Sequence, residues 1–94
     1  MAFQVRVRIN KNTINVLSVA SSSEEFEKFT IGKLKEKALS LFPGVNDPER
    51  LRVIFGESEL KDEQTFENCE IEHLSVLVVV LLMPGGRESF EDVL

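Results

Sequence analysis

Residues 3–10 alternate between apolar and polar side chains with a strict period of two. This period predicts a β-strand with one buried face. The sequence "NKN" at residues 10–12 is typical of a turn, and residues 13–19 resume an extended pattern, so a hairpin is predicted. Two adjacent apolar residues, Val16 and Leu17, interrupt the second alternation and predict a β-bulge at that point.

The centre of the chain contains one predicted helix. Residues 20–29, "ASSSEEFEKF", are polar and acidic without a clear period, and are predicted to form a loop. Thr30 is a good N-cap for a helix over residues 31–42. The helix ends at "PG", residues 43–44. Its apolar stripe follows spacings of three and four and consists of Ile31, Leu34, Ala38, Leu41 and Phe42.

The second half of the chain returns to extended patterns. A turn at residues 46–49, "NDPE", precedes a short β-rich run, "LRVIF", at residues 51–55. Residues 56–73 are mostly polar, and a final apolar run follows at residues 74–83. The predicted order is strand, strand, helix, strand, irregular stretch, strand. Three residues of the irregular stretch are expected to anchor it in the core: Leu60, Phe66 and Ile71.

The last strand is apolar on both faces, although a single helix can cover only one face of a sheet. If Leu77 and Val79 point towards the helix, the alternate residues point away from it. The outward set is Val76, Val78, Val80 and Leu82, joined by Ile54 from residues 51–55. Exposed apolar patches of this kind mark partner surfaces. A second interpretation stays open, in which Phe26 and Phe29 fold over that face.

Composition limits the possible functions. The chain has 94 residues, enough for one small domain, and a formal net charge of −5 without a basic stripe. Nucleic-acid binding is therefore not expected. Its one cysteine and the absence of metal-ligand spacing predict no disulfide, metal site or cofactor. No apolar run is long enough for a membrane helix. A cytoplasmic or nuclear monomer without membrane attachment is expected.

The residues resemble the ubiquitin family. The likeness covers about residues 3–86 and needs no gap from Arg50 onward, with insertions before that in residues 21–29 and near residues 41–45. Besides "LRVIF", the positions in register are Leu60, Asp62, Thr65, Ile71, Ser75 and Leu77. Among ubiquitin-like domains, the pattern is most similar to the N-terminal domain of parkin, a ubiquitin ligase. The resemblance implies an α+β, β-grasp fold, with a mixed four- to five-stranded sheet packed on one helix.

The resemblance also implies where partners bind. Ubiquitin uses an apolar sheet-face patch, and the predicted partner-binding residues at the matching place are Arg52, Ile54, Val78, Val80 and Leu82. One lobe of ubiquitin's patch falls near Asn10 and is lost. Glu57 and Glu59 stand where ubiquitin has uncharged residues, so an acidic rim is expected to select partners with Lys or Arg around an apolar anchor.

A diglycine, Gly85 and Gly86, falls in register with the pair at which ubiquitin is conjugated to target lysines. Glycines suit a slender terminus that enters an activating enzyme. They are equally common where domains end, and residues 1–84 are expected to form the domain with a flexible tail at 85–94. Leu82 and Pro84 depart from ubiquitin's tail. A non-conjugated binding domain is favoured, and a modifier processed after Gly86 is the alternative.

No catalytic residue is predicted. Cys69 and His73 lie four residues apart, but no third group orients the histidine as a base. Lys35, in the predicted helix, is expected to form a structural salt bridge, as its counterpart does in ubiquitin. The expected partners belong to the ubiquitin–proteasome system: proteasome subunits, ubiquitin-interacting motifs and a parent ligase or, for a modifier, activating and conjugating enzymes. A self-associating structural module is a third possibility.

Overall fold

The computed structural model describes residues 2–82. The predictions about Gly85, Gly86 and the tail at 85–94 lie outside the described residues. Five strands form one mixed sheet in the order β2-β1-β5-β3-β4. The elements in chain order are β1 (Phe3–Asn10), β2 (Thr13–Ala20), α1 (Ser23–Lys28), α2 (Ile31–Ala38), the 3₁₀ turns η1 (Leu39–Leu41) and η2 (Pro48–Arg50), β3 (Leu51–Phe55), β4 (Ser58–Leu60) and β5 (Val76–Leu81).

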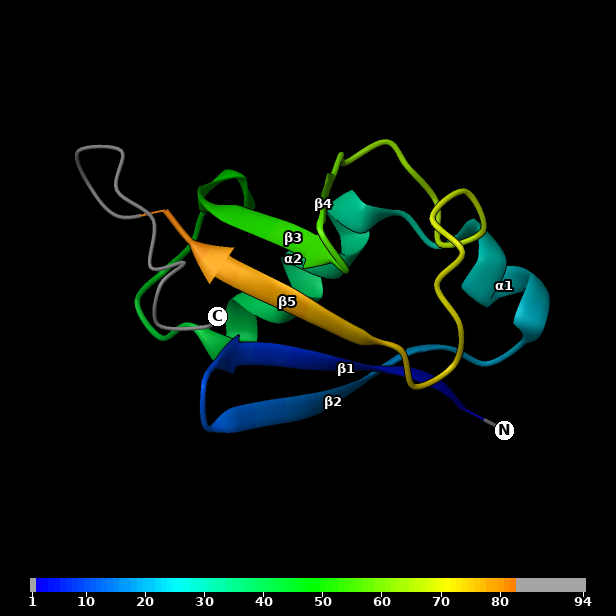
Figure 1. Ribbon diagram of the computed structural model, residues 1–94, viewed down its shortest axis with the longest axis horizontal. Helices are drawn as coiled ribbons and strands as arrows, with labels where there is room; N and C mark the ends of the chain where they lie inside the picture. Colours follow the sequence, from blue (N-terminus) through cyan, green and yellow to red (C-terminus); the bar gives the residue numbers. More distant parts are fainter. Residues whose placement is uncertain (1, 83–94) are drawn as a thin grey trace.

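The last strand, β5, lies in the middle of the sheet (Figure 1). It runs parallel to β1 and antiparallel to β3, while β1–β2 and β3–β4 are antiparallel pairs. A strand covered on one face alone is expected to alternate apolar and polar residues, because its other face meets solvent. The sequence "VLVVVL" of β5 is apolar on both faces, so the helix on one face does not account for it. The mixed sheet with a helix packed on it confirms the predicted α+β, β-grasp class.

The main core lies between the sheet and α2. Val5 and Val7 of β1, Leu34 of α2, and Leu77 and Val79 of β5 are all fully buried in it. These strand residues occupy every second position, as the alternation predicts. Leu60, Phe66 and Ile71 also belong to this cluster, which confirms the three predicted anchors.

The α2 helix begins as predicted and ends early. Thr30 is its N-cap, and the Thr30 side chain accepts a hydrogen bond from the Lys33 amide at 3.3 Å. The helix was expected to reach residue 42, but it ends at Ala38 and continues as η1. In that turn the Ser40 hydroxyl donates to the Lys37 carbonyl at 3.0 Å. Such side-chain bonds compete with helical ones, which favours the tighter turn.

Residues 20–29 were expected to form a loop, but Ser23–Lys28 within them form the helix α1. Ser22 caps α1 and accepts a hydrogen bond from the Glu25 amide at 3.2 Å. Ser at the N-cap with Glu at N3 is the capping-box pattern, the sequence signal that the loop prediction missed. The helix buries Phe26 in the main core, 5.1 Å from Phe66 between ring centroids. Phe29 also packs against this core, so neither ring supports the interpretation that they cover the opposite face.

Two further local expectations were wrong. The β1–β2 register is regular at Val16 and Leu17, and it shifts instead between Phe3 and Gln4 and between Arg8 and Asn10. Adjacent apolar residues are accommodated without a bulge because Leu17 contacts the core while Val16 lies in solvent. The polar stretch after β3 was expected to be irregular, yet residues 58–60 pair with β3 as β4. Gly56, with φ of +65°, allows the tight turn between them.

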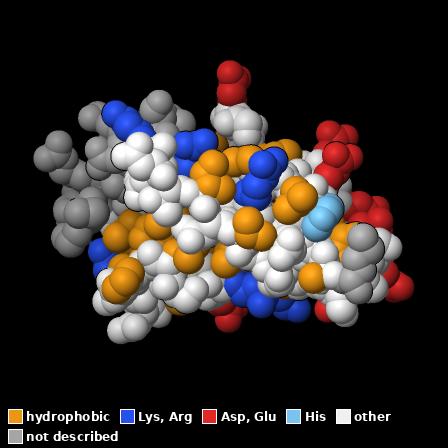
Figure 2. Space-filling model, turned by 90° about the horizontal axis from the view of Figure 1, so that it is seen from below, with side chains coloured by type: hydrophobic (Ala, Val, Ile, Leu, Met, Phe, Trp, Pro, Cys, Tyr) orange, Lys and Arg blue, Asp and Glu red, His pale blue; other side chains and the backbone are white. Residues whose placement is uncertain are grey.

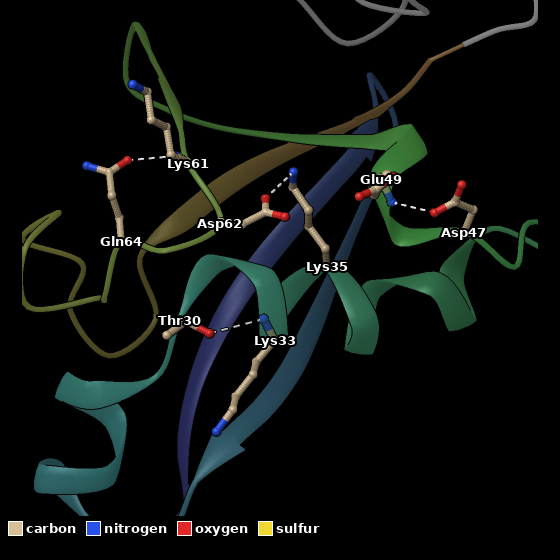
Figure 3. A network of polar contacts seen from close by, with 8 residues as sticks. All are labelled: Thr30, Lys33, Lys35, Asp47, Glu49, Lys61, Asp62 and Gln64. Carbon is tan, nitrogen blue, oxygen red and sulfur yellow. Dashed lines mark hydrogen bonds and ion pairs between the residues drawn. The ribbon is translucent and has the colours of Figure 1, made fainter.

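Residues 61–66 run beside the start of α2. The amides of Ile31 and Gly32 donate to the carbonyls of Gln64 and Asp62, each at 3.0 Å. A Cβ at position 32 would lie 3.4 Å from that Asp62 carbonyl oxygen, so glycine allows the close approach. Figure 3 shows Lys35 reaching from α2 to the Asp62 side chain. The Nζ–Oδ1 distance is 2.6 Å, which confirms the predicted structural salt bridge.

Candidate functional site

The face of the sheet away from α2 carries its own apolar cluster. Ile54 and Val80 are buried together, with Val78 packed against them, and this cluster is separate from the main core. Its members come from the two central strands, because Ile54 of β3 lies directly opposite Val78 of β5. We call Ile54, Val78 and Val80 the β3–β5 patch. The structure therefore places the two strands' outward residues together, as the alternation predicts.

The β3–β5 patch is less exposed than the sequence indicates. Ile54 is 6% exposed and Val80 is fully buried. Val76, Val78, Leu82 and Arg52 are each partly buried. The expectation that Ile54 and Val80 stand open to solvent is therefore wrong. The accessible apolar surface of the site comes from Val76 and Val78 of β5 and from Leu82.

The end of β5 is tied to the chain before β3. The Leu82 amide donates to the Arg50 carbonyl at 2.7 Å, and the Arg50 guanidinium donates to the Leu82 carbonyl at 3.3 Å. Arg52 lies opposite Val80 in the β3–β5 ladder. Its Nη1 is 3.5 Å from Glu59 Oε1, and Glu59 itself lies opposite Ile54. All five predicted site residues therefore lie on adjoining parts of β3 and β5.

The charges around the β3–β5 patch differ from the acidic rim that was expected. Glu59 is paired with Arg52, so its charge is partly compensated. On the other side of β5, the outward residues of β1 are Arg6 and Arg8, placed opposite Val76 and Val78. Sequence reasoning treated the arginines as scattered because they are distant from β5 in the chain. The sheet order brings them against the patch, so its β1 side is basic.

The ubiquitin family model matches residues 3–84, nearly all of the chain, including every described strand.

The chain belongs to the ubiquitin family.

A comparison with individually curated proteins found no match. The family match agrees with the five-stranded sheet and the packed helix.

Within this ubiquitin-family domain, the surroundings of Cys69 and His73 differ from those of a nucleophile and its base. Partial burial raises the pKa of the Cys69 thiol above its ordinary value, which lowers the fraction of reactive thiolate at neutral pH. His73 Nδ1 accepts a hydrogen bond from the Gln4 amide at 3.0 Å, so it acts as a cap for the start of β1. Its ring also lies edge-on to Phe3, 5.8 Å away between centroids.

Among residues 2–82, no group of three or more His, Cys, Asp or Glu side chains is arranged to hold a metal ion. None of the helices described is long and apolar enough to cross a membrane. The candidate site itself presents apolar side chains of β5 beside Arg6 and Arg8 of β1.

Proposed function

We propose that this ubiquitin-like domain is non-catalytic and binds receptors of the ubiquitin–proteasome system through the β3–β5 patch and the adjoining residues Arg52 and Leu82. The observation that carries the proposal is the separate apolar cluster on the sheet face that α2 leaves uncovered. A cluster in that place has no role in holding α2 to the sheet. Apolar surface at the centre of such a face, flanked by charges, is typical of protein-binding sites.

The accessible side chains determine how a receptor binds. Val78 is the most central of the partly buried residues, with Arg8 opposite it on β1 and Ile54 opposite it on β3. A receptor helix would place an apolar residue on Val78 and a carboxylate near Arg8 or Arg52. Charge-assisted hydrogen bonds of this kind orient a partner more than they add affinity. Proteasome subunits and helical ubiquitin-interacting motifs are the proposed receptors, in the cytoplasm or the nucleus.

The test is calorimetric titration of a synthetic ubiquitin-interacting helix into wild-type chain and two matched variants. Val78→Ser removes apolar surface at the centre of the β3–β5 patch and should weaken binding about tenfold or more. Val45→Ser makes the same change at a partly buried valine between η1 and η2, outside the sheet. It should leave this affinity unchanged. If the helix binds folded Val78→Ser and wild type with equal affinity, the proposal is wrong.

A parkin-like parent would add one specific receptor. In that case the β3–β5 patch would bind the catalytic part of the same ligase in cis. The support is the sequence pattern "LRVIF" at residues 51–55, which forms β3 and places Arg52 and Ile54 at the patch. Binding of a separately purified ligase core, lost in Val78→Ser, tests this addition.

The alternative function is a conjugated modifier that uses Gly86. Its support is the sequence, in which Gly85 and Gly86 lie three and four residues after Leu82, the last described residue. Intact mass of the chain in its native cell extract tests it directly. Loss of the mass of "RESFEDVL", together with adducts that disappear in Gly86→Ala, would establish conjugation. An unprocessed chain without adducts would exclude conjugation in that cell extract.

A further inference from the structure

The edge strand β2 carries two exposed apolar side chains that the β3–β5 patch does not explain. Ile14 and Val16 are 44% and 52% exposed, among the most exposed large apolar residues of the described chain. They alternate with the inward-facing residues of β2, so both lie on the sheet face away from α2. A half-buried strand normally places polar residues there. Paired apolar residues at such positions indicate a contact surface.

Two arginines lie beside them. In the β1–β2 register, Arg8 is opposite Ile14 and Arg6 is opposite Val16. Each guanidinium has a carbonyl partner: Arg6 Nε donates to Leu74 at 2.8 Å, and Arg8 Nη1 donates to Lys11 at 3.1 Å. Within residues 2–82, the ion pairs are made by other cations, and neither Arg6 nor Arg8 is paired with a carboxylate. Both charges are therefore available to an acidic partner.

The positive charge of Arg6 and Arg8 is confined to a small part of an otherwise acidic surface. Figure 2, seen from below and so from the side of β2, shows hydrophobic side chains beside Lys and Arg side chains across the middle of the molecule. Acidic side chains gather at the end where α1 lies, and α1 itself contributes Glu24, Glu25 and Glu27. The net charge of −5 would repel nucleic acid and anionic membranes. A short acidic segment that contacts only Arg6, Arg8 and the apolar residues beside them avoids most of that repulsion.

We propose that Ile14, Val16, Arg6 and Arg8 form a second docking strip, which binds an acidic amphipathic helix of a separate protein. Residues two apart on a strand are separated by about 6.8 Å. Residues four apart on a helix are separated by about 6 Å along its axis. A helix parallel to β2 therefore places successive apolar residues on Ile14 and Val16. Its acidic flank then lies over Arg6 and Arg8, where each guanidinium can bind a carboxylate.

A second copy of the chain fits the strip less well than such a helix. Two copies stacked through this face would bring Arg6 and Arg8 of one copy against the same residues of the other. Like charges brought together without carboxylates oppose association. The strip borders the β3–β5 patch at Arg6 and Arg8, but its apolar residues are on β2, on the other side of β1 from β5.

The experiment selects 16-residue peptides from a random display library against the full chain. The enriched peptides are then titrated into wild type and four variants, each checked for a wild-type amide NMR spectrum outside the changed strands. Ile14→Thr/Val16→Thr keeps β-branched side chains but removes apolar surface. Arg6→Gln/Arg8→Gln removes the two charges. Lys33→Gln/Lys37→Gln removes two charges from exposed residues of α2 and is the matched control. Val78→Ser reports on the β3–β5 patch.

The proposal predicts enriched peptides with apolar residues at helical spacing and Asp or Glu along one flank. Their affinity should fall about tenfold or more in each strip variant, and stay at the wild-type value in Lys33→Gln/Lys37→Gln and Val78→Ser. Peptides without acidic residues, or with undiminished affinity for both strip variants, would overturn it. Sedimentation that shows the wild-type chain as a dimer and Ile14→Thr/Val16→Thr as a monomer would also overturn the proposal. Sensitivity to Val78→Ser alone would overturn the strip and support the β3–β5 patch.

Discussion

Lys35 Nζ lies 2.6 Å from Asp62 Oδ1, and this ion pair joins α2 to the segment that follows β4. The two partners differ in burial: the Lys35 side chain is 11% exposed and that of Asp62 is 55% exposed. The ammonium therefore depends on the carboxylate more than the reverse. A lysine held in this way is a poor acceptor for conjugation, which agrees with its structural role.

Asp62→Asn should destabilise the domain by about 1–2 kcal/mol, because it leaves a mostly buried ammonium without its counter-ion while water still reaches the site. Glu63→Gln changes the neighbouring exposed carboxylate in the same way and should shift the free energy of unfolding by less than about 0.5 kcal/mol. Urea denaturation measures both. Equal effects of the two substitutions would show that the ion pair does not contribute.

Phe26→Ala should lower the free energy of unfolding by about 3 kcal/mol, because the ring is 5% exposed and contacts both Phe3 and Phe66. The measurement is thermal and urea unfolding of the chain. Glu27→Ala, at the next position of α1 and exposed, is the control and should have little effect. A loss near zero for Phe26→Ala would mean that α1 does not pack on the core in solution.

The Cys69 thiol should react slowly with iodoacetamide at pH 8. Its raised pKa leaves less thiolate than in a free cysteine peptide, so the reaction should be slower than the peptide's and should accelerate at a higher pH than the peptide's reaction does. The folded state holds the Cys69 proton more tightly than the unfolded state does. The protonated thiol therefore contributes to folding stability below the ordinary thiol pKa, and this contribution is lost as pH rises through the pKa of the folded state. Reaction as fast as the peptide's would contradict this account.

Four of the five strands and the main core were predictable from sequence because their signals are local. The period of two in β1, the apolar run of β5 and the Thr30 cap each determine structure within a few residues. The helix α1 was missed because its single buried side chain, Phe26, gives no periodicity, and only the Ser22–Glu25 capping pattern marks it.

The site was only partly predictable because its charges depend on strand order. Ile54 and Val78 follow from alternation, whereas their exposure does not. Arg8 is 70 positions before Val78 in the chain but lies opposite it in the sheet. Neither that pairing nor the placement of Ile14 beside Arg8 can be read from a local pattern. An acidic rim was expected from Glu57 and Glu59 for the same reason.

The central claim, that the sheet face around Val78 is the receptor site, is tested most directly by amide NMR mapping. A synthetic ubiquitin-interacting helix is titrated into isotope-labelled full chain, and shifted amides are placed on the structure. The account predicts saturable shifts concentrated in residues 51–55 and 76–82, absent in Val78→Ser. Shifts confined to α1 and α2, or shifts that persist unchanged in Val78→Ser, would contradict it.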